Sequence, residues 1–558
     1  MIIGIDMGGT NIDGVIIEDG RIIKSIKRPT DRSDLFETIY STLRELLVNH
    51  DKSKIERINL STTVSTNAIV EGKTSPVGMI IQPGPGMAYD HLACGEENTF
   101  ISGYVDHRGN VVDKLDKSEI KDIIKRYKEA GITTCGVVTK FSTRNPQHEI
   151  EIKEILGQDF SPVTMGHTMS GKLNFPRRVY TSYLNSAVYS TFNEFACNIK
   201  KSIAEEGIDA PVFILKADGG TMTIDKAKDN PVETNLSGPA ASFMGISALL
   251  PTEKDAILLD VGGTTTDIFF LADGIPLFEP QGIKIEDYKT LVRSIYSVSI
   301  GIGGDSSIEI VDNNIKIGPE RQGKPYAFGG PKPTPTDAMI VEGLISYGEE
   351  YKDKAEEAMN ELAKKIDLTI YETSKLVLEK MAYVIKDNIN RLLDEINSHP
   401  VYTIKELLHG KKIEPEVINI IGGPAEALAP ILEKEMNIPC RYPSNYLVAN
   451  AVGAALARPT MEISMHVDTS KKILSVPELN IYEKISSHFN LEMAKQRAID
   501  LVKEEGLSIG SKSNIDAEIT EESSFNMVRG YRTLGKDIRV KAQIKPGLIQ
   551  ELGGDYNA

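Results

Sequence analysis

Cysteine is scarce in this chain of 558 residues, and its four cysteines lie far apart. Cys94, Cys135, Cys197 and Cys440 form no C-x-x-C pair, so a disulfide framework, a zinc knuckle and an iron–sulfur ligand set all lack support. We expect four single thiols. The same absence argues against an ATPase that injects electrons through a cluster shared between subunits.

Long apolar runs and clusters of basic residues are missing as well. No uninterrupted apolar stretch approaches the roughly 20 residues needed to span a bilayer. The chain starts Met-Ile-Ile-Gly-Ile-Asp, which is an acidic strand end and not a basic flank with an apolar signal core. The formal net charge is −16. We therefore expect a cytoplasmic protein whose main partner is neither nucleic acid nor membrane.

The remaining composition is that of a globular protein with several domains. Hydrophobic residues make up 41 % of the chain and charged residues 25 %, which excludes wholesale disorder. A chain of this length is too long for one core, since domains usually have roughly 100–200 residues. We expect a first half over residues 1–190, a second half over 191–458, and a C-terminal domain over 459–558.

Apolar periodicity predicts alternating strands and helices, and hence α/β layers with a partly parallel sheet. Short strands are expected at residues 2–5, 15–17 and 22–23, and a similar alternation of strands and helices begins again at about residue 212. A helical insertion at about 340–400 has one apolar stripe. Strands at 463–467 and 538–544 and a helix at 491–505 predict a small α+β appendage that could serve assembly.

The most informative feature is an octet that occurs twice. Asp6-Met7-Gly8-Gly9-Thr10-Asn11-Ile12-Asp13 recurs as Asp260-Val261-Gly262-Gly263-Thr264-Thr265-Thr266-Asp267. Each copy follows an apolar strand and runs into another, so D-x-G-G-T-x-x-D is a strand–turn–strand. Walker loops and Rossmann fingerprints differ because a helix follows them. One copy could be an ordinary turn, but two copies with matched flanking strands indicate a shared function.

The residue types in the octet suit phosphate binding. Adjacent glycines let backbone N–H groups approach a phosphate closely, and the threonine and asparagine side chains add short donors. Asp6 and Asp260 could bind the water shell of a magnesium ion or position an attacking group, because magnesium prefers carboxylate and water oxygens. Two such hairpins facing each other would hold a triphosphate from both sides.

Two further segments complete the pattern. Gly422-Gly423 ends an apolar strand and would let a base and ribose lie against the backbone. Residues 448–455 form a predicted helix of small side chains, which permits close helix–helix contact at a hinge.

In this order, these motifs resemble the actin-like ATPase superfamily. The likeness narrows to the hydantoinase A / 5-oxoprolinase family through five further segments: Ser61 to Ala68, Phe141 to Glu149, Asn174 to Arg178, Ser237 to Ala241 and Gly303 to Ser306. It runs from residue 1 to about 458. It implies an α/β fold in which duplicated actin-like (ribonuclease H-like) ATPase domains surround a nucleotide cleft, with the helical insertion and C-terminal appendage added.

The resemblance also implies an activity. The family uses ATP to hydrolyse cyclic amides, such as hydantoins and 5-oxoproline, or to carboxylate ketones. An amide carbonyl is a poor electrophile, and phosphorylation of its oxygen creates a leaving group. Phosphoryl transfer requires mainly positioning and charge neutralisation. A hydantoinase B-type subunit normally works with the A component; since this chain has 558 residues, we expect that partner as a separate chain in a hetero-oligomer.

The resemblance assigns roles to particular residues. Asp6 and Asp260 would be catalytic and would organise magnesium, and the nucleotide would contact Gly8, Gly9, Thr10, Asn11, Asp13, Gly262, Gly263, Thr264, Thr265, Asp267, Gly303, Gly304, Asp305, Gly422 and Gly423. The cyclic amide would contact candidates among Thr63, Asn67, Arg144, His148, Arg177 and Arg178, although arginines in such turns often form surface or interdomain ion pairs instead.

Three alternatives remain open from the sequence. The chain could be a ketone carboxylase subunit, a small-molecule kinase of the same superfamily that releases a phosphate ester, or a non-enzymatic nucleotide switch. His91, His107 and His167 show no ligand spacing, so a zinc site has no support.

Overall fold

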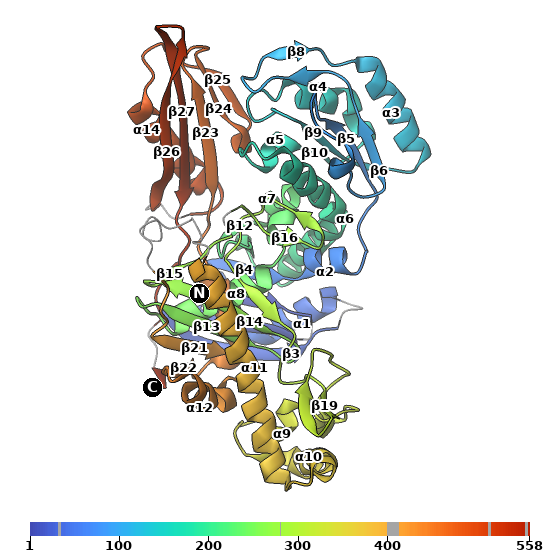
Figure 1. The fold of residues 1–558 in the computed structure, drawn as a ribbon, viewed down its shortest axis with the longest axis vertical. Coiled ribbons are helices and arrows are strands. Elements are labelled where there is room, and N and C mark those ends of the chain that lie inside the picture. The colour runs from blue at the N-terminus through green and yellow to red at the C-terminus, as the bar shows by residue number, and fades with distance from the viewer. Residues whose placement is uncertain are drawn as a thin grey trace.

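The computed structural model describes residues 1–9, 11–31, 35–279, 281–398, 412–511, 515–552 and 556–557. The molecule is elongated (Figure 1), with two sheets in the middle, helices at one end, and a small α/β unit beside a C-terminal sheet at the other. None of the described helices combines the length and the apolar character needed to cross a membrane.

The first central sheet contains both strands of the first octet. Its order is β12-β11-β4-β1-β2-β3, with bounds β1 Ile2–Met7, β2 Asn11–Glu18, β3 Arg21–Pro29, β4 Arg57–Thr62, β11 Val212–Leu215 and β12 Thr221–Thr223. β1, β2 and β3 are antiparallel, whereas β4 and β11 run parallel to β1. Asp19 and Gly20 make the predicted hairpin turn with positive φ values of 48° and 73°.

The second central sheet repeats this topology. Seven strands belong to it: β18 (Val298–Ile300) also pairs with β14 and β28 (Tyr556–Asn557) with β22. The other five run in the order β15-β14-β13-β21-β22, with bounds β13 Ala256–Val261, β14 Thr266–Ala272, β15 Ile275–Pro276, β21 Val417–Ile421 and β22 Cys440–Pro443. Again the first three strands are antiparallel and the last two join in parallel. Both sheets therefore have the strand order 3-2-1-4-5, and the duplicated actin-like fold expected from the twin octets is confirmed.

Two helices of small residues lie between the sheets. They are α8 (Ser237–Leu249) and α13 (Ala449–Leu456). A Cβ on Gly453 would lie 2.0 Å from the Ala241 carbonyl oxygen, and one on Gly245 would lie 2.1 Å from the Ala449 carbonyl oxygen. The predicted close helix contact is thus present, and only glycine at these positions allows it.

The helical insertion forms one end of the molecule (Figure 1). It consists of α9 (Pro335–Val341), α10 (Lys352–Ile366) and α11 (Ile370–Ser398). The predicted apolar stripe lies in its core, as these side chains are buried: Val377, Met381, Ile385, Ile389, Leu392 and Ile396.

A separate parallel sheet follows the first octet. Its order is β10-β9-β5-β6, with bounds β5 Val77–Gln82, β6 Glu97–Phe100, β9 Thr134–Thr139 and β10 Val163–Met165. The helices α3 (Lys117–Glu129) and α4 (Gln147–Leu156) pack in this unit, and the long α6 (Phe175–Glu205) leads from it back to the centre.

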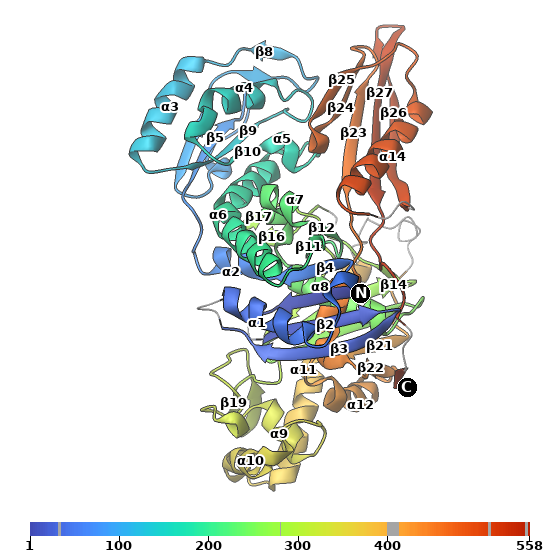
Figure 2. The same ribbon diagram turned by 180° about the vertical axis from the view of Figure 1, so that it is seen from behind.

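The C-terminal domain is an antiparallel sheet with one helix (Figure 2). Its order is β25-β24-β23-β27-β26, with bounds β23 Glu462–Asp468, β24 Ile473–Val476, β25 Ile481–Lys484, β26 Ala517–Arg529, β27 Arg532–Ile544 and α14 Leu491–Ser508. The two strands and the helix predicted here are confirmed.

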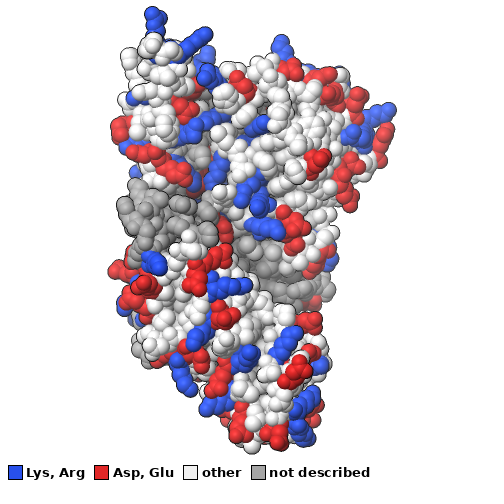
Figure 3. All heavy atoms as spheres, viewed as in Figure 1, with Lys and Arg blue, Asp and Glu red and all other residues white. Residues whose placement is uncertain are grey.

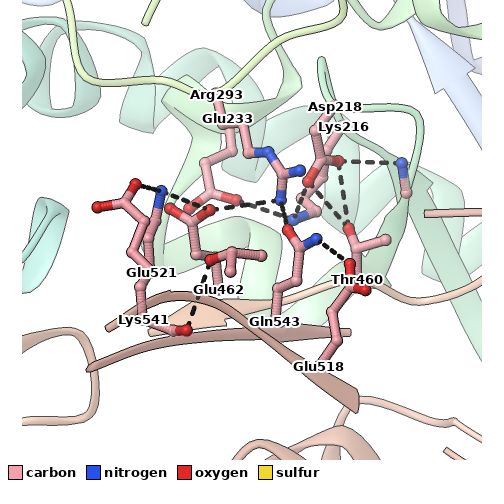
Figure 4. A network of polar contacts seen from close by, with 12 residues as sticks. Lys216, Asp218, Glu233, Arg293, Thr460, Glu462, Glu518, Glu521, Lys541 and Gln543 are labelled. Carbon is pink, nitrogen blue, oxygen red and sulfur yellow. Dashed lines mark hydrogen bonds and ion pairs between the residues drawn. The ribbon is translucent and has the colours of Figure 1, made fainter. Parts of the chain in front are cut away.

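A network of charged and polar side chains joins this domain to the central sheets (Figure 4). The Glu462 carboxylate forms ion pairs with Arg293 at 3.5 Å and with Lys541 at 3.0 Å. Lys216 pairs with Asp218 at 3.3 Å, and Thr460 donates to the same aspartate at 3.1 Å. The C-terminal domain is therefore held to the core by paired, partly desolvated charges.

Candidate active site

The two octets fold into turns with the same strand register and the same backbone hydrogen bond. The Gly8 N–H donates to the Asn11 carbonyl at 3.0 Å, and the Gly262 N–H donates to the Thr265 carbonyl at 2.9 Å. The octet's two aspartates face each other in each hairpin, Asp6 across from Asp13 and Asp260 across from Asp267. Thr10 lies outside the described residues.

The first glycine of each turn leaves space beside its Cα. In the described part of the chain, a Cβ on Gly8 would meet only the Asn11 carbonyl oxygen, at 3.1 Å, and one on Gly262 only the Thr265 carbonyl oxygen, at 3.3 Å. In each case that neighbour belongs to the turn itself. Both glycine N–H groups donate within the turn, so a phosphate that approaches there would depend on the side-chain donors of Asn11, Thr264 and Thr265.

The carboxylates of the two hairpins lie close enough to interact electrostatically. Burial, the Asp13 carboxylate and the Asp260 carboxylate raise the pKa of Asp6 to about 7, against hydrogen bonding from Ser61 and the charge of Lys27. Lys27 binds both oxygens of Asp13, at 2.8 and 2.7 Å. Three acidic groups thus share a region with one bound lysine, which suits a site for a divalent cation.

Asp260 is held by both central helices. Ser242 Oγ on α8 donates to its Oδ2 at 2.5 Å, and Asn450 Nδ2 on α13 donates to the same oxygen at 3.3 Å. Burial and the Asp260 charge raise the pKa of Asp267 to about 7. Neither Ser242 nor Asn450 was identified from the sequence, although each lies in or directly beside a segment that carried the resemblance.

The predicted nucleotide residues of the second half converge on its hairpin. The Gly304 N–H donates to the Gly262 carbonyl at 2.9 Å, and the Asp305 N–H donates to the Gly263 carbonyl at 2.7 Å. A Cβ on Gly303 would lie 2.6 Å from the Gly262 carbonyl oxygen, so that position requires glycine. The Asp305 carboxylate pairs with Arg321 at 2.8 Å.

Gly422 and Gly423 directly follow β21 and lie beside the second hairpin. Gly422 has a φ of 94°, and a Cβ there would lie 2.8 Å from Asp260 Oδ1. A Cβ on Gly423 would lie 3.1 Å from the Tyr347 hydroxyl, so this tyrosine of the insertion borders the site. Gly422 therefore packs against Asp260 and Gly303 against the Gly262 carbonyl, although Gly303 and Gly422 lie far from each other in the chain.

Thr63 and Asn67 lie beside the first hairpin. The Thr63 hydroxyl donates to the Met7 carbonyl at 3.4 Å, and Asn67 Nδ2 donates to the Thr63 hydroxyl at 3.1 Å. The N-terminal end of α8 meets them, because the Ser237 hydroxyl donates to the Thr62 carbonyl at 2.7 Å.

Arg177 lines a cavity of about 310 Å³ next to this region. Its Nη1 donates to three carbonyl oxygens, those of Gln281, Gly282 and Thr290, at 2.9–3.1 Å. The cavity has mixed character, with the other lining residues Leu236, Glu279, Gly282, Ile283, Lys284, Lys289, Ile295 and Ser297. Leu236 directly precedes α8, so this cavity adjoins the end of that helix.

The other three substrate candidates lie in or near the parallel-sheet unit, and their contacts favour structural roles. Arg178 is fully buried and donates to the Thr139 and Lys140 carbonyls at 2.9 and 2.8 Å. His148 is buried with Nδ1 2.8 Å from Gln82 Oε1. Burial lowers the pKa of Arg144 to about 10, although the charge of Asp537 in the C-terminal domain acts to raise it.

The arrangement of possible metal ligands shows how a cation could be held at this site. Among the residues that the structure describes, no group of three or more His, Cys, Asp and Glu is arranged to hold a metal ion directly. On the face in Figure 3, basic and acidic side chains are interspersed over the central sheets. The site therefore has no preformed metal cage, and a cation there would depend on ligand oxygens and water.

Twin hairpins on duplicated 3-2-1-4-5 sheets, with carboxylates at their interface, define the class of actin-like ATPases. Comparison with known proteins narrows this class. The hydantoinase/oxoprolinase model matches residues 178–463, and the hydantoinase/oxoprolinase N-terminal region matches residues 2–160. The chain belongs to the hydantoinase/oxoprolinase family, and an ATP-dependent enzyme is supported.

Curated relatives include proteins of two activities. The acetophenone carboxylase gamma subunit of Aromatoleum aromaticum is 24 % identical over 92 % of this chain and 75 % of that protein. 5-Oxoprolinase 1 of Arabidopsis thaliana is 23 % identical over 61 % of this chain. The match spans only 31 % of that oxoprolinase.

Solved structures share the fold over nearly the whole chain. The ATP-dependent caprolactamase of Pseudomonas jessenii has a TM-score of 0.70 at 18 % identity, covering 97 % of this chain and 87 % of that one. The nucleotide-free acetone carboxylase has a TM-score of 0.68 at 16 % identity, covering 98 % and 87 %. At these identities the likeness concerns the fold.

Proposed function

We propose that this chain is the ATP-hydrolysing subunit of a cyclic-amide hydrolase and works with a hydantoinase B-type subunit. It would bind ATP between the two hairpins and transfer the γ-phosphoryl group to the carbonyl oxygen of a hydantoin, 5-oxoproline or related lactam. The observation that carries this proposal is the pair of matching strand–turn–strand hairpins on duplicated sheets, which leaves Asp6 and Asp260 near enough for their charges to interact. Family membership and the oxoprolinase relatives support it.

The chain's own residues have separate tasks in this reaction. The N–H groups of Gly8 and Gly262 donate within their turns, so the short side-chain donors of Asn11, Thr264 and Thr265 would bind phosphate oxygens. Asp6 and Asp260 would hold the water shell of a magnesium ion, which supplies charge neutralisation during phosphoryl transfer. The Ser242 hydroxyl and the Asn450 amide keep the Asp260 carboxylate in place, so little reorganisation is needed there as charge develops.

The cavity beside Arg177 is the proposed location of the cyclic amide. Its volume of about 310 Å³ suits a small ring, and it adjoins the end of α8 that meets Thr62 and Thr63. Thr63 and Asn67 would then lie between phosphate and substrate. Arg177→Met should raise the KM for the cyclic substrate more than the KM for ATP.

Ketone carboxylation is the second candidate, and the acetophenone carboxylase gamma subunit favours it. In that reaction phosphorylation would activate an enolate oxygen or bicarbonate. The two candidates differ in one requirement, because only carboxylation needs bicarbonate.

A phosphate-release assay separates the candidates. The chain is incubated with MgATP and a panel of lactams, hydantoins and ketones, with and without bicarbonate and a co-expressed B-type subunit. We expect a lactam or hydantoin to raise turnover without bicarbonate. Turnover that needs a ketone and bicarbonate supports the second candidate, whereas a stable phosphate ester identifies a kinase. If no compound raises turnover with the partner present, the cyclic-amide proposal is wrong.

A further inference from the structure

The C-terminal sheet has two very different edges. On one side its outermost strand is β25, with four residues, and on the other it is β26, with 13 residues. Short edge strands protect sheets against unwanted pairing, whereas a long open edge presents a row of unpaired backbone groups to another strand. In the described part of the chain, β26 pairs with β27 on one side only.

The outer part of this edge projects beyond the sheet. β23 pairs with β27 as far as Asp468 opposite Asp537, and Thr469 still hydrogen-bonds Lys536, so residues 526–535 form a two-stranded ribbon. Apolar side chains at the base of this ribbon and along it are exposed, with Phe525 at 59 %, Val528 at 66 % and Leu534 at 53 %. A two-stranded ribbon is only marginally stable in water. These exposed side chains indicate a contact surface.

Charge is separated along β26. Glu518, Glu521 and Glu522 lie in its first half, and Arg529 ends it. Residues 525–536 contain three basic residues, Arg529, Arg532 and Lys536, and no acidic one, in a chain with a net charge of −16. Figure 3 shows this polarity at the upper left, where basic side chains lie at the outer end and acidic ones below.

We infer that β26 pairs antiparallel with β26 of a second copy of this chain, giving a two-fold symmetric dimer with one continuous sheet. Antiparallel pairing puts the acidic half of each strand beside the basic end of the other, whereas parallel pairing would put like charges together. Centred on Phe525, the pairing places Glu521 opposite Arg529 of the second copy and the two phenylalanines against each other. A two-fold axis makes each contact twice.

The regular part of the strand matches this register. From Glu521 to Met527 every residue of β26 has one partner on β27, and the irregularities lie at Ile519/Glu521 and Met527/Val528. Glu521 is also dispensable to its own subunit. It contacts Lys541 at 3.5 Å, and Lys541 keeps its closer ion pair with Glu462 at 3.0 Å when Glu521 changes.

Charge reversal tests the inference on the full-length protein. Sedimentation equilibrium of the wild type should give a dimer, and Glu521→Lys and Arg529→Glu should each weaken it by tenfold or more, because each creates two like-charged pairs. An equimolar mixture of the two variants should dimerise again, since every pair is then opposite in charge. The double variant Glu521→Lys/Arg529→Glu should also dimerise. Lys484→Glu, on the opposite edge strand β25, is the matched control and should behave as wild type.

Several outcomes would overturn this inference. A wild type that is monomeric at 50 µM would do so, as would a dimer that both single variants leave intact. Loss of dimer without recovery in the mixture would show that the substitutions act by misfolding, and circular dichroism of each variant checks this independently. If the variants instead weaken binding to a co-expressed B-type subunit or to phosphatidylserine vesicles while the chain stays monomeric, the edge serves a different partner. None of these results depends on the proposed reaction.

Discussion

Ser242 Oγ lies 2.5 Å from Oδ2 of Asp260, so a helix packed between the two sheets fixes the carboxylate at the end of β13. Asn450 contacts the same oxygen from α13. The helices that join the two halves are therefore also the elements that orient a proposed catalytic group. A movement of one half against the other would change the hydrogen bonds that orient the Asp260 carboxylate.

Removing either carboxylate should stop the reaction without unfolding the protein. We expect Asp6→Asn and Asp260→Asn each to lower ATP turnover by about 100-fold or more, because they remove charge at the site of phosphoryl transfer. Phosphate release measures the effect, and circular dichroism checks the fold. Asp19→Asn, in the exposed turn between β2 and β3, is the control and should retain full turnover. Full activity in Asp6→Asn or Asp260→Asn would refute the proposed role.

Loss of the Ser242 hydroxyl should have a smaller effect. Ser242→Ala leaves Asp260 in place but unsupported on α8, so we expect kcat to fall by about tenfold while the KM for ATP changes less. Ser247→Ala on the same helix is the matched control, since that hydroxyl donates to the Phe243 carbonyl within α8. Equal loss of turnover in both variants would indicate a general weakening of the helix.

The contact between α8 and α13 should not tolerate a methyl group. Gly453→Ala would bring a Cβ within 2.0 Å of the Ala241 carbonyl oxygen, and we expect a loss of about 2–3 kcal/mol in the free energy of unfolding. Urea denaturation measures it. Gly238→Ala is the control, because its Cβ would meet only Thr63 Cγ2 at 3.9 Å and alanine favours a helix. An unchanged Gly453→Ala protein would contradict the packing.

The network in Figure 4 should anchor the C-terminal domain. Glu462→Gln leaves Arg293 and Lys541 without their shared carboxylate, and we expect a loss of about 2 kcal/mol together with faster proteolysis between the core and this domain. Lys545→Gln is the control, since its ion pair with Glu518 is long and exposed. Equal proteolysis rates for wild type and Glu462→Gln would exclude an anchoring role.

Asp537 should make stability depend on acid pH. Burial opposes its ionisation, but hydrogen bonding from His466 and the charges of Arg539 and Arg144 outweigh burial and lower the pKa of Asp537 from 3.8 to about 2. A carboxyl group with a lowered folded-state pKa stabilises the protein above its unfolded pKa and loses this contribution as pH falls through the folded one.

We therefore expect Asp537→Asn to lower the free energy of unfolding by about 1 kcal/mol above pH 5, after allowing for partial exposure. The difference from wild type should disappear between about pH 4 and pH 2. Urea denaturation across this range measures it. Asp287→Asn, whose side chain is 99 % exposed, should show no such difference. A constant difference down to pH 2 would contradict the ionic origin.

Local patterns predicted the hairpins and most helices, because strand alternation, glycine turns and apolar stripes depend on near neighbours in the chain. The strand–Gly-Gly pattern identified Gly422 and the family resemblance identified Gly303 as site residues; the structure brings Gly422 to Asp260 and Gly303 to the Gly262 carbonyl. The role of Arg178 could not be predicted from its motif. A motif does not distinguish an arginine that binds a ligand from one whose guanidinium is buried against carbonyl oxygens, as that of Arg178 is. The separate parallel sheet was missed, since its short strands resemble those of the central fold.

By itself, the sequence determined the repeated octet, the duplicated fold and the identity of the glycines and aspartates in the turns. Each of these follows from backbone freedom and apolar spacing within a few residues. Only the tertiary structure decided that Asp6 and Asp260 interact, that Ser242 and Asn450 hold one carboxylate, and that β26 is an open edge. Asp6 and Asp260 lie in different halves of the chain and Asn450 is 190 residues from Asp260, so these relationships depend on the packing of α8 against α13, which brings the two sheets together. The open edge depends on which strands pair in the folded C-terminal sheet.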